Sequence, residues 1–383
     1  MNVAVLVSGG VDSSVALRLL KDEGHELTAF YLKIWLEDEL AFLGECPWED
    51  DLQYVRAVCE EAGVPLEIVP FQKEYWERVV AYTIAEVKAG RTPNPDMLCN
   101  ARIKFGAFLD FLAGKSSPER PQGVEGSIMS IGTFDKIATG HYANVEEKEE
   151  MFFLKTTPDA IKDQTYFLSQ LTQGQLSKAL FPVGGLKKSE VRALAEKFQL
   201  SNAERKDSQG ICFLGKIPFD KFLEYHLGKR PGKLIEYETK KVLGGHNGFW
   251  YFTVGQRRGI KLSGGPWYVV KKDSETNEIF ISHGEHHEEL ARDSFTVGGL
   301  NWIVGGTVPL SLEDSTAPLG KGSMKRELMV KVRHGAKLYP ATVEFLENDK
   351  LEVSLKEKDQ GIASGQFAVF YDGEYCLGGG VIL

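Results

Sequence analysis

The chain opens with MNVAVLVSGGVDSS, in which a short apolar strand at Val3–Val7 leads directly into a glycine turn that ends in Asp and two serines. Gly9 and Gly10 can adopt backbone angles that are closed to other residues, so successive N–H groups can converge on an anion. The run Ser13–Leu20 has helical apolar spacing, which places a helix N-terminus and its positive dipole behind the same anion. This opening therefore predicts a strand, a phosphate-binding turn and a helix.

The turn belongs to neither of the two commonest nucleotide-binding patterns, because SGGVDSS fits neither GxGxxG nor GxxxxGK[ST]. It resembles the pyrophosphate loop of the ATP pyrophosphatases, which split ATP into AMP and pyrophosphate to adenylate a substrate. The resemblance implies an ATP site in which Asp12 helps to hold Mg²⁺. An ordinary strand-to-helix turn is the alternative for SGG alone, whereas the full heptapeptide after a first strand is more specific.

Strand and helix patterns alternate through the N-terminal half, which predicts an α/β fold with a doubly wound parallel sheet. The turn after the first strand agrees with ligand binding at the carboxyl edge of such sheets. The expected strands are Val3–Val7, Thr28–Ile34, Leu66–Val69 and Lys136–Thr139.

Two further domains are expected after this sheet. Short strands and glycine turns in GKLIEYETKKVLGG, GFWYFTVGQ and PWYVVKKD predict a small β-rich central domain. Strand patterns in LMVKVRH, ATVEFLE, KLEVSL and FAVFYDG predict a C-terminal β-barrel, a fold that can grip RNA. The predicted boundaries are 1–216, 217–286 and 287–383, within the loose expectation of about 150 residues per domain.

Composition limits the possible partners. The 383 residues are 43% hydrophobic and 26% charged, as in soluble globular proteins, and no apolar run is long enough to span a bilayer. The net charge of −9 argues against general nucleic-acid affinity but allows a local basic surface. Candidates for such a surface, each of which taken alone is more often a solvated face, are Lys187, Lys188 and Arg192, Arg205 with Lys206, Arg257 with Arg258, Lys271 with Lys272, and Lys325 with Arg326.

The five cysteines are too few and too scattered for a disulfide scaffold or a CxxC zinc site, and no metal-ligand set is predicted among them. Cys59 and Cys376 lie in apolar patterns that indicate core packing, and Cys46 has no evident role. Cys99 and Cys212 instead lie among polar and turn-forming residues. These two thiols are therefore the candidates for chemistry.

Cys99 follows the stiff TPNP loop, and the apolar spacing after it is helical, so it is expected near a helix start. That position would lower its pKa and favour the thiolate, although a buried inert cysteine is an equal alternative. Cys212 follows Arg205 and Lys206, whose charges would also stabilise a thiolate. Spacing alone does not show that the two cysteines meet.

Eight blocks of the chain resemble, in the same order, the tRNA-specific 2-thiouridylases: SGGVDSS, GRTPNPDMLCN, ATGHYA, KDQTYFL, KDSQGICFLG, FWYFTVGQRRG, GGPWYVV and GQFAVFYDGEYCLGGG. The resemblance covers nearly the whole chain. It implies ATP-dependent replacement of the C2 oxygen by sulfur at the wobble uridine of tRNA. It also implies ATP and Mg²⁺ as cofactors, a persulfide donor such as a cysteine desulfurase or a sulfur relay protein, no membrane partner, and a monomeric enzyme.

The chemistry explains why such residues are needed. An amide-like carbonyl oxygen leaves poorly, so ATP must first adenylate it, and a cysteine persulfide is a suitable sulfur carrier. By resemblance, Cys212 carries the persulfide and Cys99 assists sulfur release, ending in a Cys99–Cys212 disulfide. Asp96 would be a general acid/base, with Asn94 and Pro95 shaping the pocket for a flipped uridine.

The resemblance also assigns contacts residue by residue. ATP contacts fall on Leu6, Val7, Ser8, Gly9, Gly10, Val11, Asp12, Ser13, Leu32 and Gly140. Contacts to tRNA fall on Asn94, Pro95, Asp96, His141, Lys162, Asp163, Gln164, Arg333, His334 and Gln366. Without the resemblance, the polar residues outside the loop would be ordinary surface groups, and His141 would be a structural histidine as often as a ligand.

One stretch departs from the usual family pattern. The connection between Phe111 and Ile137 is long and rich in Pro, Gly and Ser, which predicts a surface loop. This stretch, with FYLKIW in the second strand, is similar to plastid-type members. A cytoplasmic location is expected, with the plastid stroma or mitochondrial matrix as alternatives if a transit peptide is missing.

Two other functions share part of this pattern. An adenylating enzyme that amidates a small acid would need SGGVDSS but neither Cys99 nor Cys212. A non-catalytic tRNA-binding protein could keep the loop for folding alone. Serine substitution of the cysteines separates the first from a thiouridylase, and tRNA-stimulated AMP formation excludes the second.

Overall fold

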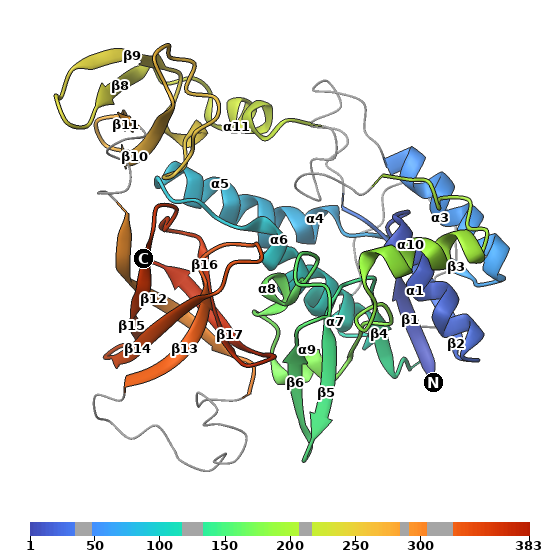
Figure 1. The fold of residues 1–383 in the computed structure, drawn as a ribbon. Helices are drawn as coiled ribbons and strands as arrows, with labels where there is room; N and C mark the ends of the chain where they lie inside the picture. Colours follow the sequence, from blue (N-terminus) through green and yellow to red (C-terminus); the bar gives the residue numbers. More distant parts are fainter. Residues whose placement is uncertain (35–47, 117–132, 207–216, 284–290, 305–324) are drawn as a thin grey trace.

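The structure is a computed structural model, and it describes residues 1–34, 48–116, 133–206, 217–283, 291–304 and 325–383. Three bodies follow one another along the chain: an N-terminal α/β domain, a small central β domain and a C-terminal barrel (Figure 1). Within the described ranges, no helix combines the length and apolarity that a bilayer crossing requires.

The N-terminal domain is built on a five-stranded parallel sheet in the order β3-β2-β1-β4-β7. The chain first moves outward from β1 to β3 and then returns to place β4 on the other side of β1. This reversal puts a switch point at the carboxyl end of β1, where such sheets bind ligands. The doubly wound fold and its four predicted strands are confirmed. The sheet has one further strand, β7, and its members are β1 Asn2–Leu6, β2 Glu26–Lys33, β3 Leu66–Pro70, β4 Lys136–Ala138 and β7 Ala179–Leu180.

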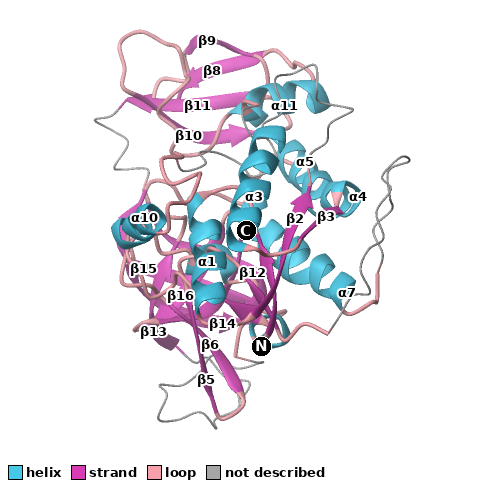
Figure 2. Ribbon diagram, turned by 90° about the vertical axis from the view of Figure 1, so that its right-hand side faces the viewer, coloured by secondary structure: helices cyan, strands magenta, loops and turns pink. Residues whose placement is uncertain are grey.

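Alternating residues of β1 explain the two helical layers. Val3 and Val5 belong to a core that includes residues of α1 (Val11–Asp22) and α3 (Trp48–Ala62). Ala4 and Leu6 belong to the core on the opposite face, because successive side chains of a strand point to opposite sides. That second layer comprises α4 Gln72–Tyr75, η2 Trp76–Val80, α5 Ala81–Lys88, α6 Pro95–Leu98, η3 Cys99–Ala107 and α7 Phe108–Leu112, where η2 and η3 are π-helical (Figure 2).

The rest of the N-terminal domain follows β4 in the chain and includes α10 (Lys188–Lys197). Helix α10 packs on α1 through Val191 and Ala195. A hairpin and two single-turn helices complete the domain: β5 Asn144–Lys148, β6 Met151–Lys155, α8 Thr165–Leu168 and α9 Gln173–Leu176.

The central domain carries a four-stranded sheet in the order β10-β11-β8-β9. The block GFWYFTVGQ, which was expected to be extended, instead forms the 3₁₀ turn η4 Phe249–Tyr251 and a loop. Phe249 and Phe252 are both buried, and their spacing of three suits a helical turn rather than the period of two of a strand. The other elements are α11 Phe219–Leu227, β8 Gly232–Glu236, β9 Val242–His246, β10 Trp267–Asp273 and β11 Glu278–His283.

The C-terminal domain is a closed barrel of six strands within the described residues, which confirms the predicted barrel. It closes because β12 pairs with both β15 and β17. A Cβ on Gly378 would lie 2.0 Å from the Asn301 carbonyl oxygen, so the glycines of β17 let the closing strand approach. The strands are β12 Arg292–Trp302, β13 Lys325–Lys331, β14 Tyr339–Leu346, β15 Lys350–Asp359, β16 Phe367–Asp372 and β17 Tyr375–Ile382.

The barrel is joined to the N-terminal domain by strand pairing and by a buried ion pair. Strand β17 also pairs antiparallel with β6 of the β5–β6 hairpin, with Cys376 opposite Leu154. Lys331 Nζ lies 3.2 Å from Asp163 Oδ1, and the two side chains are only 4% and 3% exposed. Thr165 Oγ1 and the Thr157 N–H also donate to the Asp163 carboxylate. The carboxylate thus has its own set of donors at the domain interface.

Replacing Lys331 by methionine should lower the free energy of unfolding by about 3–5 kcal/mol, because it leaves the Asp163 carboxylate buried without its cation. Urea titration followed by tryptophan fluorescence measures the change. Lys356→Met is the matched control, since Lys356 forms an ion pair with Glu327 whose side chains are 59% and 60% exposed, and its loss should cost less than about 1 kcal/mol. Equal losses in the two variants would contradict this account of the interface.

Candidate active site

The SGGVDSS turn forms a compact loop between β1 and α1. Gly9 has φ +75°, a conformation that favours glycine, and Gly10 is the N-cap of α1. The Ser8 N–H donates to Ser13 Oγ at 3.2 Å, and Ser13 Oγ donates to the Gly10 carbonyl at 3.0 Å. The backbone N–H groups of the first turn of α1 have no helical acceptor, which is the arrangement that binds phosphate. The loop therefore has the shape that an ATP polyphosphate requires.

Two glycines of the predicted ATP site are required by close packing. A Cβ on Gly9 would lie 2.7 Å from the Asp51 carbonyl oxygen. A Cβ on Gly140 would lie 2.6 Å from Ser13 N and 2.7 Å from the Asp12 carbonyl carbon. Gly140, which follows β4, thus contacts the loop at the switch point of the sheet.

The remaining predicted ATP contacts lie at the same edge. Leu6 and Val7 are buried at the end of β1, and the Val7 N–H donates to the Phe30 carbonyl of β2. Leu32 lies near the end of β2, half-buried, and pairs with Val69 of β3. All ten predicted positions therefore fall on or beside the carboxyl end of this sheet.

Asp12 has a carboxylate oriented by two donors. Tyr142 Oη donates to its Oδ1 at 2.8 Å, and Lys188 Nζ lies 2.7 Å from the same atom. Among the described residues, Oδ2 accepts no hydrogen bond. One carboxylate oxygen beside a phosphate loop fits Mg²⁺, which proteins bind through one or two carboxylates together with substrate phosphates. The described residues contain no group of three or more His, Cys, Asp or Glu that could hold a metal ion.

Sequence reasoning missed several residues that support the loop. Asn202 Nδ2 donates to the Gly9 carbonyl and to Ser14 Oγ, both at 2.8 Å. Arg205 Nη1 donates to the Gly9 carbonyl at 2.9 Å, and its guanidinium forms an ion pair with Asp51. The sequence indicated Arg205 as a neighbour of Cys212 and as a candidate for a basic surface, but not as a support of the loop. Nothing local marks these residues, because each reaches the loop from nearly 200 positions away.

The TPNPD loop leads into a longer helix than expected. Asn94 Oδ1 accepts from the Met97 N–H at 3.4 Å, and Pro95 takes the first helical position. The helical run therefore begins at Pro95, four residues before Cys99, and Cys99 opens its π-helical part. π-Helical turns are rare and are frequent at functional sites.

The predicted low pKa of Cys99 is not what this structure shows. The side chain is 2% exposed, and burial raises its pKa, opposed by the positive charge of Lys104 and reinforced by the carboxylate of Asp96. The helix dipole cannot offset this burial from the fifth position of the run. In this arrangement Cys99 is a thiol, so it needs a base or a change of environment before it can attack.

Barrel residues approach the same loop. Gln366 Nε2 donates to the Thr92 carbonyl at 2.9 Å. The ring of His334 stacks on Phe167 with the ring centroids 4.5 Å apart. Burial lowers the pKa of His334, and the carboxylate of Asp96 opposes this shift. Arg333 makes a bidentate pair with Asp359 at 2.7 Å, with its side chain 49% exposed. The structure thus brings the predicted tRNA contacts of the barrel next to Asn94–Asp96.

The KDQ block divides into different roles. Lys162 is half-buried, whereas Asp163 is 3% exposed and has its carboxylate occupied by the interface donors described above. The Asp163 carboxylate is therefore occupied at the domain interface, and a contact of this residue with tRNA stays a prediction. Gln164 forms two hydrogen bonds with the backbone of Tyr142.

His141 is a buried neutral group. Its Nδ1 lies 2.7 Å from Thr139 Oγ1, and burial followed by the charge of Lys104 lowers its pKa well below the usual value. Only 9% of the residue is exposed, so contact with tRNA would involve little of the ring.

Acid should destabilise the fold partly through His141. Because its pKa is lower in the folded than in the unfolded chain, the unfolded chain binds more protons as the pH falls below about 6.5, and stability is lost there. His141→Gln should reduce this loss in urea titrations between about pH 5 and 8. His334, whose pKa is also lowered, should retain part of the slope. An unchanged slope in the variant would contradict the prediction.

Cys212, the second predicted catalytic cysteine, lies outside the described residues, as does Cys46. Cys59, Cys99 and Cys376 are free thiols in the part of the chain that is described. Burial raises the pKa of Cys59 to about 11 and that of Cys376 to about 12. Both values fit the core-packing role expected for these two residues.

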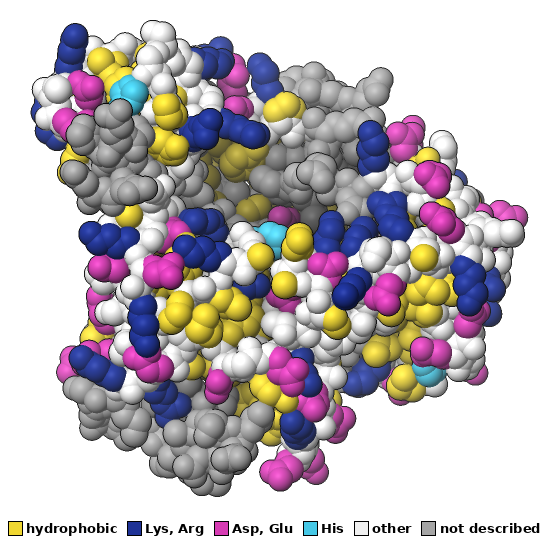
Figure 3. Space-filling view, in the orientation of Figure 1, with side chains coloured by type: hydrophobic (Ala, Val, Ile, Leu, Met, Phe, Trp, Pro, Cys, Tyr) yellow, Lys and Arg dark blue, Asp and Glu magenta, His cyan; other side chains and the backbone are white. Residues whose placement is uncertain are grey.

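Basic side chains gather around a hollow in the molecule. In Figure 3, Lys and Arg side chains lie along the lower edge of the central domain and on the surfaces opposite. Arg257 and Arg258 are exposed, whereas Arg192 donates to the Ala203 and Arg205 carbonyls and Lys188 pairs with Asp12. The predicted local basic surface therefore includes the central domain.

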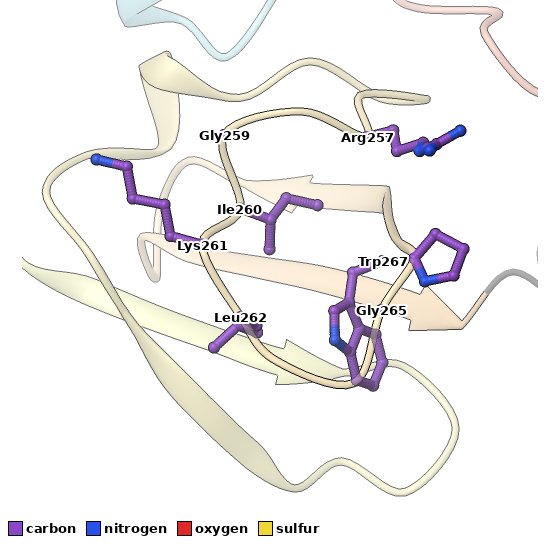
Figure 4. Close-up of a pocket in the computed structure, with 8 residues that line it drawn as sticks. Arg257, Gly259, Ile260, Lys261, Leu262, Gly265 and Trp267 are labelled. Atoms are coloured by element: carbon purple, nitrogen blue, oxygen red, sulfur yellow. The ribbon is translucent and has the colours of Figure 1, made fainter.

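The central domain also carries an open pocket of about 370 Å³, lined by Arg257, Lys261 and Trp267 among others (Figure 4). The pocket lies on a different domain from the SGGVDSS loop and Cys99. It is therefore separate from the candidate active site.

Comparison with known proteins accounts for the whole chain. Three family models match in succession: a tRNA methyl transferase HUP domain at 1–216, a tRNA methyl transferase PRC-barrel domain at 220–283 and an aminomethyltransferase beta-barrel domain at 292–382. A solved 4-thiouridine synthetase–RNA complex with bound ATP aligns with 58% of this chain and 49% of its own at 15% identity, but its TM-score of 0.31 is too low to support an argument.

Relatives of full length agree on one name. The tRNA-specific 2-thiouridylase MnmA of Parabacteroides distasonis is 45% identical, with 100% of this chain and 99% of the relative covered. Those of Porphyromonas gingivalis and Bacteroides thetaiotaomicron are each 42% identical with the same coverage. These relatives are bacterial, so the long connection before ATGHY does not require a plastid origin. The chain belongs to the family of tRNA-specific 2-thiouridylases.

Proposed function

We propose that this protein is a tRNA-uridine 2-sulfurtransferase that uses ATP to thiolate the wobble uridine of tRNA in the cytoplasm. One observation supports it most directly: the Phe181 ring packs edge-on against His141 and against Phe105 of the π-helix that begins at Cys99. Gly140, next to His141, packs in turn against Asp12 and Ser13 of the phosphate loop. A thiol and an ATP loop therefore share one neighbourhood. An amidating enzyme with this loop would have no use for that thiol.

The first step is activation of the uracil. The C2 oxygen attacks the α-phosphate of ATP, an O–P bond forms and pyrophosphate leaves. Ser8–Ser13 and the start of α1 hold the phosphates through backbone N–H groups, while Lys188 supplies a cation. Asp12 would hold Mg²⁺, whose charge would stabilise the negative charge of the polyphosphate.

The second step delivers sulfur. The terminal sulfur of a persulfide on Cys212 attacks C2, and AMP leaves with the original oxygen. Attack of Cys99 on the inner sulfur of Cys212 then breaks the S–S bond and forms a Cys99–Cys212 disulfide, which an external dithiol must reduce. Asp96 serves as the acid/base at the uridine, and the positive charge of Lys104 favours the Cys99 thiolate that this step requires.

The tRNA lies across the boundary between the first and third domains in this proposal. Asn94, Pro95, Arg333, His334 and Gln366 form one wall, because the barrel brings the last three to the TPNPD loop.

Incubation with unmodified tRNA, MgATP and a persulfide donor tests the reaction, with AMP and 2-thiouridine read by mass spectrometry. Thiouridine at the wobble position is the expected result. AMP without thiouridine under varied donors would favour another adenylating enzyme, and the absence of both products would favour a tRNA-binding protein. An amidating enzyme would also release AMP without tRNA when given its acid and amine.

A further inference from the structure

We propose that Tyr142 is a positioning residue for the Asp12 carboxylate and that Gln164 holds Tyr142 in place. The KDQ block would then serve the ATP loop as well as the RNA. The link between ATP and tRNA rests on the proposed function, whereas the positioning of Asp12 does not.

Tyr142 is built into the loop support. The residue is 1% exposed and packs with Val11 and Val15 of α1. Its Oη donates to Asp12 Oδ1 at 2.8 Å, the same atom that Lys188 contacts. With both donors on Oδ1, the carboxylate has one defined orientation, and Oδ2 remains for a cation. A phenol is suited to this role because it adds no charge that would compete with the metal.

Gln164 forms hydrogen bonds with both the N–H and the carbonyl group of Tyr142. The Tyr142 N–H donates to Gln164 Oε1 at 2.9 Å, and the Gln164 N–H donates to the Tyr142 carbonyl at 2.9 Å. This pair of bonds links segments 22 positions apart. The position of the Tyr142 ring, and with it the orientation of Asp12, thus depends on Gln164.

The preceding residue, Asp163, anchors this connection to the barrel. Asp163 pairs with Lys331, and Phe167 of the same segment stacks on the His334 ring at 4.5 Å. One short segment therefore contacts the support of the ATP loop on one side and the proposed RNA wall on the other. If tRNA binding restrains this segment, MgATP and tRNA must strengthen each other's binding by the same factor.

Tyr142→Phe removes only the hydroxyl. We expect it to weaken MgATP binding by about tenfold, the range for a hydrogen bond to a charged group, with tRNA affinity unchanged. Equilibrium dialysis gives the MgATP affinity, and filter binding gives the tRNA affinity. Excess Mg²⁺ should recover part of the lost nucleotide affinity, which a general loss of structure would not allow. Tyr375→Phe is the matched control, since its hydroxyl donates to the Glu146 carboxylate at 2.6 Å in the remote β5–β6 hairpin.

Gln164 provides a second pair of variants in case Tyr142→Phe fails to fold. Gln164→Leu removes the acceptor and should weaken MgATP binding, although the Gln164 side chain is bonded to the Tyr142 backbone and not to Asp12. Gln164→Glu keeps an acceptor oxygen and should restore it. MgATP affinity within twofold of the unchanged protein in both Tyr142→Phe and Gln164→Leu would overturn the inference. Failure of the unchanged protein to thiolate tRNA would reject the proposed function and leave this binding test intact.

Discussion

Cys99→Ser should lower the rate of 2-thiouridine formation by about a hundredfold or more, while pyrophosphate is still released in the first turnover. Serine is nearly the same size as cysteine and fits the same buried position, so the fold should be retained. A serine side chain cannot break the S–S bond of a persulfide. Its hydroxyl is not ionised at neutral pH, and an oxygen atom cannot form a disulfide. Quench-flow measurement of pyrophosphate, with mass spectrometry of the tRNA, separates the two steps.

Cys59→Ser is the control for this variant. Cys59 is also buried and also has a raised pKa, but it lies on α3, in the core on the opposite face of the sheet from the core that holds Cys99. It should therefore keep full activity. Thiouridine formation by Cys99→Ser at the rate of the unchanged protein would exclude a role for this thiol in sulfur transfer, and the amidating alternative would then gain support.

Gly140→Ala should weaken MgATP binding by about a hundredfold, because the added Cβ cannot avoid the backbone. It would lie 2.6 Å from Ser13 N, where an ordinary contact is at least about 3.4 Å, and a neighbouring backbone cannot rotate away as a side chain can. The first turn of α1 must shift, and its N–H groups then no longer point toward the same phosphate. Equilibrium dialysis with labelled ATP measures the loss, and tRNA affinity should change little.

Gly174→Ala is the matched control for this backbone contact. A Cβ at Gly174 meets nothing within 4 Å, and the residue lies in the short helix α9. Alanine is favoured there over glycine, so stability and nucleotide binding should be preserved. Unchanged MgATP affinity in Gly140→Ala would show that the contact between β4 and the phosphate loop is unimportant for binding.

Much of the N-terminal fold could be predicted from local patterns. The strands β1–β4 are short apolar runs, and their alternation with helical spacing specifies a parallel sheet because parallel strands need helical crossovers. The phosphate loop was equally visible, since Gly9 occupies a backbone conformation that other residues avoid. Strand β12 of the barrel and the β5–β6 hairpin of the N-terminal domain were missed, because their strand character depends on pairing with distant segments rather than on alternation along the chain.

The candidate site was predicted less completely, for the same reason. The motifs identified Asp12, Asn94–Asp96 and Cys99, but not the groups that determine how these side chains behave. Burial reversed the expected pKa shift of Cys99, and an interface partner, Lys331, removed Asp163 from the surface. Neither effect can be read from neighbouring residues.

The sequence by itself therefore determined the chemistry available to this protein: a glycine loop that can hold phosphate, cysteines outside apolar patterns and a β-rich C-terminal half. The tertiary structure alone decided how those groups are oriented and charged. Asn202 reaches Gly9 across 193 positions and Tyr142 reaches Asp12 across 130. Conformational preferences act over a few residues, whereas burial and hydrogen bonding depend on what the completed fold brings together.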